Sequence, residues 1–159
     1  MLQFNSKGLL IPNTNIKSNI SELEKEFVTS LNNQHRTELF QKYINYSDSL
    51  KSVLSDISLL QWIDGSFVTK KPNPEDIDLV TFVTANSVEA IGTRIEDFKY
   101  PLSLEKYGVD AYIVKVYDRE DKQYPLYISD RMYWMDSFDK TRRNRNGIKL
   151  PKGFLEINY

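Results

Sequence analysis

Apolar positions in the first third of the chain recur at the spacing of a helix. Leu23, Phe27 and Leu31 lie four residues apart, which places them on one helical face. Ser21 stands before them and Glu24 follows three positions later, which is the arrangement of a capping box. The pattern predicts a helix that begins at Ser21.

A second, longer helix is expected from about Arg36 to Leu54. Its apolar face is formed by residues at helical intervals, namely Leu39, Phe40, Tyr43, Ile44, Leu50 and Leu54. The N-terminal segment, residues 1–19, is instead rich in Asn, Ser and Lys and contains Pro12. We expect that segment to form an extended or loosely packed arm.

Short runs of apolar, β-branched and aromatic residues predict the strands. They cover residues 57–63, 76–84, 108–117 and 153–157. Helices are expected at residues 87–96 and 126–138, and a charged loop at residues 118–123. For a chain of 159 residues, this pattern predicts one α+β domain over residues 1–159, in which helices back a small mixed β-sheet.

Composition narrows the classes of function. The formal net charge is −1, so no overall field draws the chain to nucleic acid or to a membrane. The absence of cysteine excludes disulfides, thiolate catalysis and zinc–thiolate sites. The sequence has neither a signal peptide nor an apolar run of the roughly 20 residues that a membrane helix needs. We therefore expect a cytoplasmic protein that contacts no membrane.

Two aspartates near the middle of the chain carry the strongest chemical signal. An apolar run ends in Gly65-Ser66, a loop with two prolines and two lysines follows, and the next run opens with Asp76 and Asp78. Side chains two residues apart in a strand share a face, so these carboxylates are expected to lie about 7 Å apart. Because like charges so close repel, the pair favours a bound divalent cation, Mg²⁺ first.

Three further residues make this signal more specific. Gly65 permits a close backbone approach to a ligand, and Ser66 adds a hydroxyl donor, which together suit a phosphate group. Asp110 lies near the start of the strongest predicted strand, where an aspartate is rare unless it is paired or bound to metal. Three carboxylates can hold two Mg²⁺ ions roughly 3.5–4 Å apart.

These residues resemble the nucleotidyltransferase superfamily typified by DNA polymerase beta, and its small, minimal bacterial members in particular. The resemblance covers about residues 57–117. It implies that Asp76 and Asp78 bind both metal ions, with Mn²⁺ as an alternative to Mg²⁺. It also implies that Asp110 binds the catalytic ion and helps to activate the acceptor hydroxyl, and that Ser66 lies near the nucleotide phosphates.

The flanking sequence, with its late Pro-Lys-Gly-Phe, resembles an uncharacterised bacterial branch of this superfamily to which no reaction is attached. Two features depart from the superfamily pattern. The loop between Ser66 and Asp76 is longer than in the most compact members. The chain also shows no further domain of the kind that grips the acceptor in large members.

Basic residues outside the motif have two interpretations. Lys70 and Lys71 either contact phosphate or form a solvated loop tip. The basic C-terminal segment, residues 140–159, contains an unbroken block of one sign, namely Lys140, Arg142, Arg143, Arg145, Lys149 and Lys152. That block is either a solvated tail or a clamp for the triphosphate or the acceptor. Lys70, Arg142 and Arg143 join Gly65 and Ser66 as the candidate nucleotide ligands.

The leading hypothesis is a Mg²⁺-dependent nucleotidyltransferase that moves a nucleoside monophosphate from ATP or another NTP to an acceptor hydroxyl. The acceptor is expected to be a macromolecule, either a partner protein or an RNA. A toxin–antitoxin or phage-defence setting follows from family analogy alone. A homo-oligomer or a toxin-type partner is a further expectation.

Two alternatives remain open. In the first, the chain is a non-catalytic nucleotide- or partner-binding module, antitoxin-like, that keeps the fold. In the second, it binds or processes RNA through the basic C-terminal segment. The near-neutral net charge argues against strong sequence-independent binding to RNA.

Overall fold

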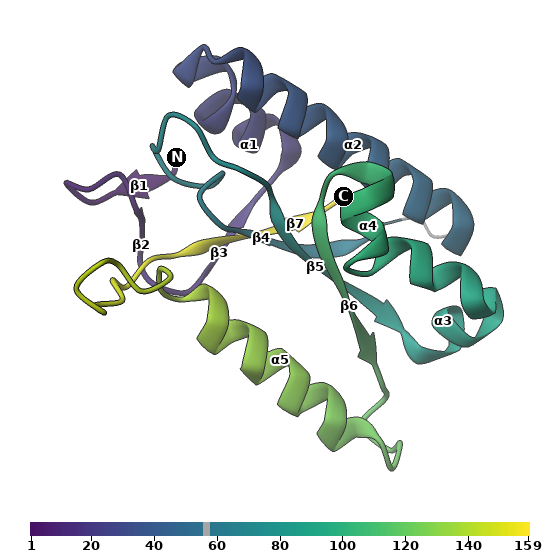
Figure 1. Cartoon of the computed structure of the whole chain (residues 1–159). Helices are drawn as coiled ribbons and strands as arrows, with labels where there is room; N and C mark the ends of the chain where they lie inside the picture. Colours follow the sequence, from purple (N-terminus) through teal and green to yellow (C-terminus); the bar gives the residue numbers. More distant parts are fainter. Residues whose placement is uncertain (56–57) are drawn as a thin grey trace.

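The structure, a computed structural model, describes residues 1–55 and 58–159. Its centre is a five-stranded mixed sheet in the order β3-β7-β4-β5-β6 (Figure 1). The strands are β3 (Asn15–Ser18), β4 (Leu60–Asp64), β5 (Asp78–Thr84), β6 (Asp110–Val116) and β7 (Phe154–Asn158). A separate antiparallel pair is formed by β1 (Gln3–Phe4) and β2 (Leu10–Ile11). The predicted α+β class with a small mixed sheet is confirmed.

Helices cover both faces of the five-stranded sheet. They are α1 (Ile20–Phe27), α2 (Gln34–Leu54), α3 (Ala85–Ile91), α4 (Leu102–Tyr107) and α5 (Tyr124–Phe138), with 3-10 helices η1 (Thr29–Leu31) and η2 (Gly92–Phe98). In Figure 1, α1 to α4 lie on one side of the sheet and α5 lies alone on the other. The predicted helices over residues 36–54 and 126–138 correspond to α2 and α5.

Strands β4 to β7 divide their side chains between two hydrophobic clusters, because alternate residues point to opposite faces. On β5, Leu79 and Val83 join the larger cluster under α1 and α2, whereas Val80 and Phe82 join the cluster beneath α5. Phe138 is the buried residue that α5 contributes. The face covered by α5 is called the α5 face below, because the candidate site lies on it.

The first helix begins at a different residue from the one predicted. Its N-cap is Asn19, whose side chain accepts a hydrogen bond from the Glu22 amide at 2.9 Å. The Ser18 hydroxyl donates to the Glu22 carboxylate at 2.8 Å. An N-cap residue has extended backbone, and Asn19 has it because it directly follows strand β3. The predicted capping box of Ser21 and Glu24 is therefore wrong.

The N-terminal segment is extended, as expected, but it is packed rather than loose. Its strand β3 pairs in parallel with β7, and Asn15 donates to Glu156 at 2.7 Å. Leu2 and Leu10 are buried in the larger cluster. The segment thus completes one edge of the main sheet.

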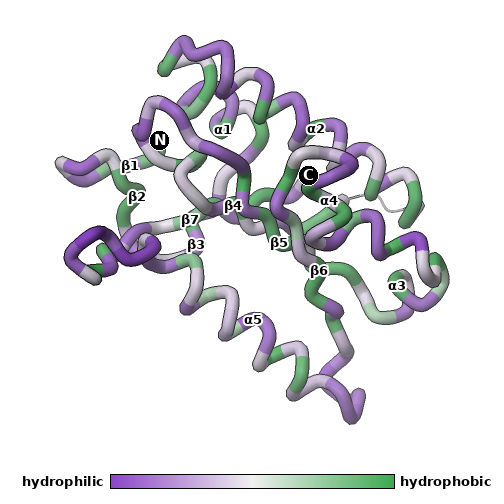
Figure 2. The backbone as a smooth tube through the Cα atoms, viewed as in Figure 1, coloured by the Kyte–Doolittle hydropathy of each residue, from purple (hydrophilic) through white to green (hydrophobic). Residues whose placement is uncertain are grey.

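The remaining boundaries differ in detail from those predicted. The helix expected at residues 87–96 is split, because Gly92 adopts φ 59° and ends α3, and a 3-10 helix follows. Strand β4 begins at Leu60, and Ile57 of the predicted strand lies outside the described residues. The basic loop between α5 and β7 forms a mostly hydrophilic stretch of the surface (Figure 2).

Candidate functional site

Three aspartates lie side by side across neighbouring strands. Asp64 ends β4 and is the partner of Asp78, which begins β5, and Asp78 is in turn the partner of Asp110, which begins β6. Partner residues on adjacent strands point to the same face of a sheet. The alternation along each strand places all three on the α5 face. We call Asp64, Asp78 and Asp110 the carboxylate row.

Gly65 brings the backbone against this row. It adopts φ 80°, a conformation that side chains strongly disfavour. A Cβ built at this position would overlap Oδ2 of Asp78. Glycine is therefore required by both its backbone angle and the space beside it, and the close approach predicted for Gly65 is to a carboxylate of the protein itself.

Asp78 occupies the centre of the row, and only 17% of its side chain is exposed. Burial, together with the negative charges of Asp76 and Asp64, raises its pKa to about 7. Arg142 acts in the opposite direction, with its Nη2 at 3.4 Å from Oδ1 of Asp78. Since Arg142 is 84% exposed, this ion pair is weak and easily exchanged.

Asp110 has a buried oxygen, Oδ1, with no hydrogen-bond partner among the described residues. Burial raises the pKa of Asp110, and the charge of Asp76 raises it further. Asp76 itself is half-buried and lies two residues before β5, so it precedes the strand instead of opening it. Its charge nevertheless acts on both Asp78 and Asp110, which places all three acids in one electrostatic site. The spacing of about 7 Å predicted for Asp76 and Asp78 assumed that both lie in one strand, and that assumption is wrong because β5 begins only at Asp78.

Asp64 forms a buried ion pair with Lys152, a residue that precedes β7. The two side chains are 8% and 5% exposed. Burial raises the pKa of Asp64, and the ammonium of Lys152 acts against this increase. The sequence pattern predicted no role for Asp64, and it predicted that Lys152 belongs to a solvated or phosphate-binding block. The two residues are 88 positions apart, so no local pattern could have connected them.

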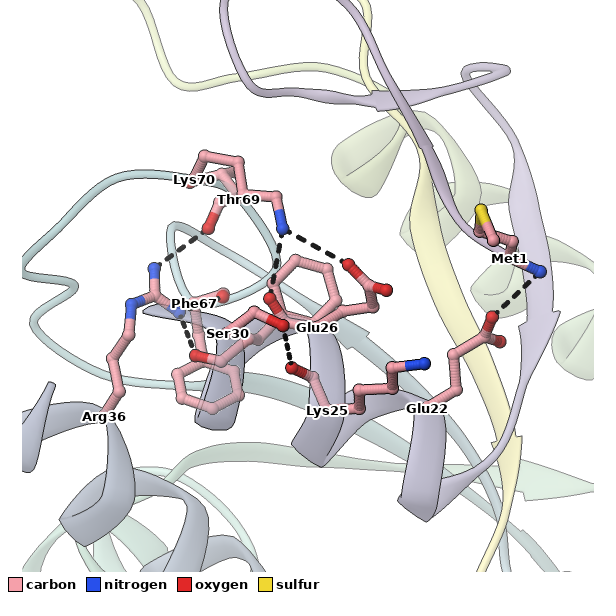
Figure 3. Close-up of polar contacts among 10 residues, drawn as sticks. Met1, Glu22, Lys25, Glu26, Ser30, Arg36, Phe67, Thr69 and Lys70 are labelled. Atoms are coloured by element: carbon pink, nitrogen blue, oxygen red, sulfur yellow. Dashed lines mark hydrogen bonds and ion pairs between the residues drawn. The ribbon is translucent and has the colours of Figure 1, made fainter. Parts of the chain in front are cut away.

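The structure separates the predicted nucleotide ligands. Arg142 reaches the carboxylate row, but Arg143 donates to the Gly147 carbonyl at 2.9 Å within its own loop. Lys70 turns toward α1, where its Nζ donates to the Glu26 carbonyl at 3.1 Å (Figure 3). The same Nζ lies 4.2 Å from the centre of the Phe4 ring. The contacts of Lys70 and Arg143 therefore lie outside the row.

Aromatic side chains pack beside the row on the α5 face. The rings of Tyr112, two residues after Asp110, and Trp134 of α5 are 4.6 Å apart. Burial, and then the charge of Asp110, raises the pKa of Tyr112 to about 12. Trp62 of β4 donates to Glu156 at 2.9 Å. The rings of Tyr112, Trp134 and Trp62 form the side of the site next to α5.

The acids available to a cation are Asp76, Asp78 and Asp110, because Asp64 is already neutralised by Lys152. Their oxygen chemistry and the unpartnered Oδ1 of Asp110 suit a hard divalent ion. Across residues 1–55 and 58–159, however, no three His, Cys, Asp or Glu side chains are arranged to hold one ion as they stand. Binding would therefore require these side chains to rotate toward one another.

Fold and site together define a class, namely an α+β protein whose mixed sheet carries a carboxylate row at one end of three adjacent strands. The profile of a family described as "Family of unknown function (DUF6932)" matches residues 2–158. The chain belongs to this family. No curated protein and no solved structure matches it. In the part of the chain that the structure describes, no helix is both long and apolar enough to cross a membrane.

Proposed function

We propose that the chain is a metal-dependent nucleotidyltransferase that moves a nucleoside monophosphate from ATP or another NTP to an acceptor hydroxyl. What supports the proposal is the electrostatic coupling of Asp78 and Asp110 to Asp76, with a raised pKa at Asp78 and an unpartnered buried oxygen on Asp110. Repulsion among these acids lowers the stability of the folded protein when no metal is bound. Such a cost is common where binding of a cation is the purpose of the site.

Mg²⁺, as two ions, or Mn²⁺ in its place is the cofactor that Asp76, Asp78 and Asp110 would hold. When bound, it supplies positive charge to the triphosphate and to the charge that develops during transfer. In this proposal the carboxylate of Asp110 takes the proton of the acceptor hydroxyl. The acceptor oxygen then bonds to the α-phosphorus while the bond to the bridging oxygen breaks, and pyrophosphate leaves with that electron pair.

Arg142 is the residue of the basic segment best placed to bind phosphate. Its guanidinium lies at the row, and its high exposure leaves it free to turn from Asp78 to an incoming phosphate. The acceptor in this proposal is a macromolecule, a partner protein or an RNA. The toxin–antitoxin or phage-defence setting and a cytoplasmic location belong to the same proposal and rest on analogy.

A second candidate function is a non-catalytic nucleotide- or partner-binding module. The observation that favours it is the Asp64–Lys152 pair, which places an ammonium group inside the row. A fixed cation of the protein could take over part of the role of a metal ion and keep the fold without the reaction. The two candidates differ in whether a nucleotide is transferred to an acceptor.

The transfer reaction tests the proposal directly. Purified protein is incubated with each α-labelled NTP, Mg²⁺ and cell extract, and covalent labelling of protein and RNA is measured. We expect labelling that is lost in the Asp76→Ala, Asp78→Ala double variant and retained in Asp118→Asn, an exposed aspartate just beyond the opposite end of β6. Labelling that persists in the double variant contradicts the mechanism. Nucleotide binding without any labelling favours the binding module.

A further inference from the structure

Tyr100 is a half-exposed tyrosine at one edge of the five-stranded sheet. It lies two residues before α4, and it is 50% exposed. Strand β6 is the last strand of this sheet, and in the described part of the chain no further strand pairs with its outer side. The segment that contains Tyr100 runs along this side, where the Tyr100 amide donates to the Ala111 carbonyl at 2.7 Å. Tyr100 is therefore bonded to β6 at the residue that follows Asp110.

The backbone and the ring of Tyr100 are both held by neighbouring residues. The buried hydroxyl of Ser103 links the same segment to β6, because it donates to the Val109 carbonyl at 2.9 Å and accepts from the Ala111 amide at 3.3 Å. The Tyr100 ring stacks on the Tyr112 ring, with centres 6.0 Å apart and planes inclined by 23°. A ring that is already oriented in this way loses little conformational entropy when a ligand binds to it.

The Tyr100 ring lies beside the Asp110 end of the carboxylate row. Tyr112 follows Asp110 by two residues in β6, so both side chains point to the α5 face. The pKa of Tyr112 is raised by burial first, then by Asp110 and further by Tyr100, which places both side chains near the Tyr112 hydroxyl. Among the described residues, Tyr112 is the one aromatic ring that packs on Tyr100. One face of the Tyr100 ring is thus covered, and its exposed face borders the site.

An exposed aromatic face next to several carboxylates suits a flat and uncharged ligand group. Nucleobases stack on such side chains whatever their sequence, because every base has a π face, and one stack contributes ~1–3 kcal/mol. The acids of the row repel an anion, whereas a neutral base meets no such repulsion. Arg142 reaches the row at Asp78 and Tyr100 lies at Asp110, so the phosphates and the base of a nucleotide would meet different residues.

We propose that the exposed face of Tyr100 stacks on a nucleobase at the Asp110 end of the carboxylate row. The inference rests on the proposed function, for which it names the residue that binds the base. The base belongs either to the NTP or to the terminal nucleotide of an RNA acceptor, since both present the same ring chemistry. The contact uses the π face of Tyr100 and not its hydroxyl, so phenylalanine should replace this tyrosine without loss.

The test compares Tyr100→Ala and Tyr100→Phe with the wild type and with a control, Tyr117→Ala, at a tyrosine just beyond the opposite end of β6. Calorimetry with Mg²⁺ measures the affinity for ATP, for inorganic tripolyphosphate and for a short single-stranded oligoadenylate RNA. We expect Tyr100→Ala to bind ATP or the RNA at least fivefold more weakly, and Tyr100→Phe and Tyr117→Ala to stay within twofold of the wild type. Tripolyphosphate has no base, so its affinity should stay within twofold in every variant.

The ligand that loses affinity identifies the source of the base. A loss confined to ATP assigns the base to the NTP, and a loss confined to the RNA assigns it to the acceptor. Unchanged affinity of Tyr100→Ala for both ligands overturns the inference and leaves the proposed function standing. An equal loss for tripolyphosphate also overturns it, because the variant has then disturbed the whole site.

The wild type alone separates the inference from the proposed function. If it binds neither ATP nor tripolyphosphate, the proposed function fails, and the RNA measurement decides whether Tyr100 binds a base. If it binds no RNA either, the inference is overturned as well. Should Tyr100→Ala not fold, Tyr100→Leu fills much of the same space without a π face, and wild-type affinity for ATP and RNA in that variant is equally contrary.

Discussion

Asp78 lies between two other carboxylates and behaves unlike an ordinary aspartate. Its pKa is raised to about 7 in the folded protein, whereas an aspartate in an unfolded chain titrates near ~3.9. Between about pH 4 and pH 7 the folded state thus holds a proton that the unfolded chain has released. Stability without metal should accordingly fall as the pH rises through this window.

Replacing this carboxylate should stabilise the metal-free protein. We expect Asp78→Asn to raise the free energy of unfolding at pH 8 by on the order of 1–2 kcal/mol, with the gain nearly gone at pH 4. Thermal unfolding in the presence of a chelator measures it, with Asp118→Asn as the control that changes nothing at either pH. A lower melting temperature for Asp78→Asn at pH 8 would contradict the assigned electrostatics.

The Asp64–Lys152 pair makes a separate prediction at the same scale. Lys152→Met leaves a buried carboxylate unpaired, and we expect it to lower the free energy of unfolding by about 3 kcal/mol. The double variant Asp64→Val, Lys152→Met should recover most of that loss, since apolar pairs often replace buried ion pairs at little cost. Urea unfolding measures both variants. If the free energy of unfolding of Lys152→Met is within about 0.5 kcal/mol of the wild-type value, the ion pair is not desolvated.

Among the elements, β4, β5 and β6 align the row through their register. A slip of one residue would turn a carboxylate to the opposite face, so the pairing Asp64–Asp78–Asp110 is as important as the residues themselves. Apolar, β-branched runs were sufficient to predict these strands, whereas the pairing of β5 with β6, which brings Asp78 and Asp110 together, is seen only in the structure. Strand β3 was not predicted, because Asn15–Ser18 has no apolar run and finds its partner in β7, at the far end of the sequence.

The turn after β4 can be tested with two glycines that share a backbone angle. Gly65 and Gly147 adopt φ 80° and 73°, but no described atom lies within 4 Å of a Cβ built at Gly147. We expect Gly147→Ala to cost about 1 kcal/mol from backbone strain alone. Gly65→Ala should cost at least 1 kcal/mol more, because its methyl group displaces Asp78. Chemical unfolding measures both variants. Equal losses of the free energy of unfolding in Gly65→Ala and Gly147→Ala would mean that the contact with Asp78 is unimportant.

For the whole molecule, the sequence predicted the α+β class and two strands that carry Asp78 and Asp110 near their starts, but it did not establish that these strands pair. It did not predict the Asp64–Lys152 pair, since that pair depends on a contact between distant segments and on burial. Lys70 and Arg143 were chosen for their charge, and charge alone does not determine where a long side chain turns. Of the three candidate metal ligands, Asp78 and Asp110 begin neighbouring strands, whereas Asp76 precedes its strand.

The measurement that most directly tests the central claim is calorimetry of ATP, GTP, CTP and UTP with and without Mg²⁺. It uses the wild type, Asp78→Asn and the control Asp118→Asn. We predict that the wild type and the control bind at least one nucleotide in a Mg²⁺-dependent manner, and that Asp78→Asn binds it at least 100-fold more weakly. Binding that is independent of Mg²⁺, or equal in Asp78→Asn and the wild type, would contradict a metal–nucleotide site at the carboxylate row.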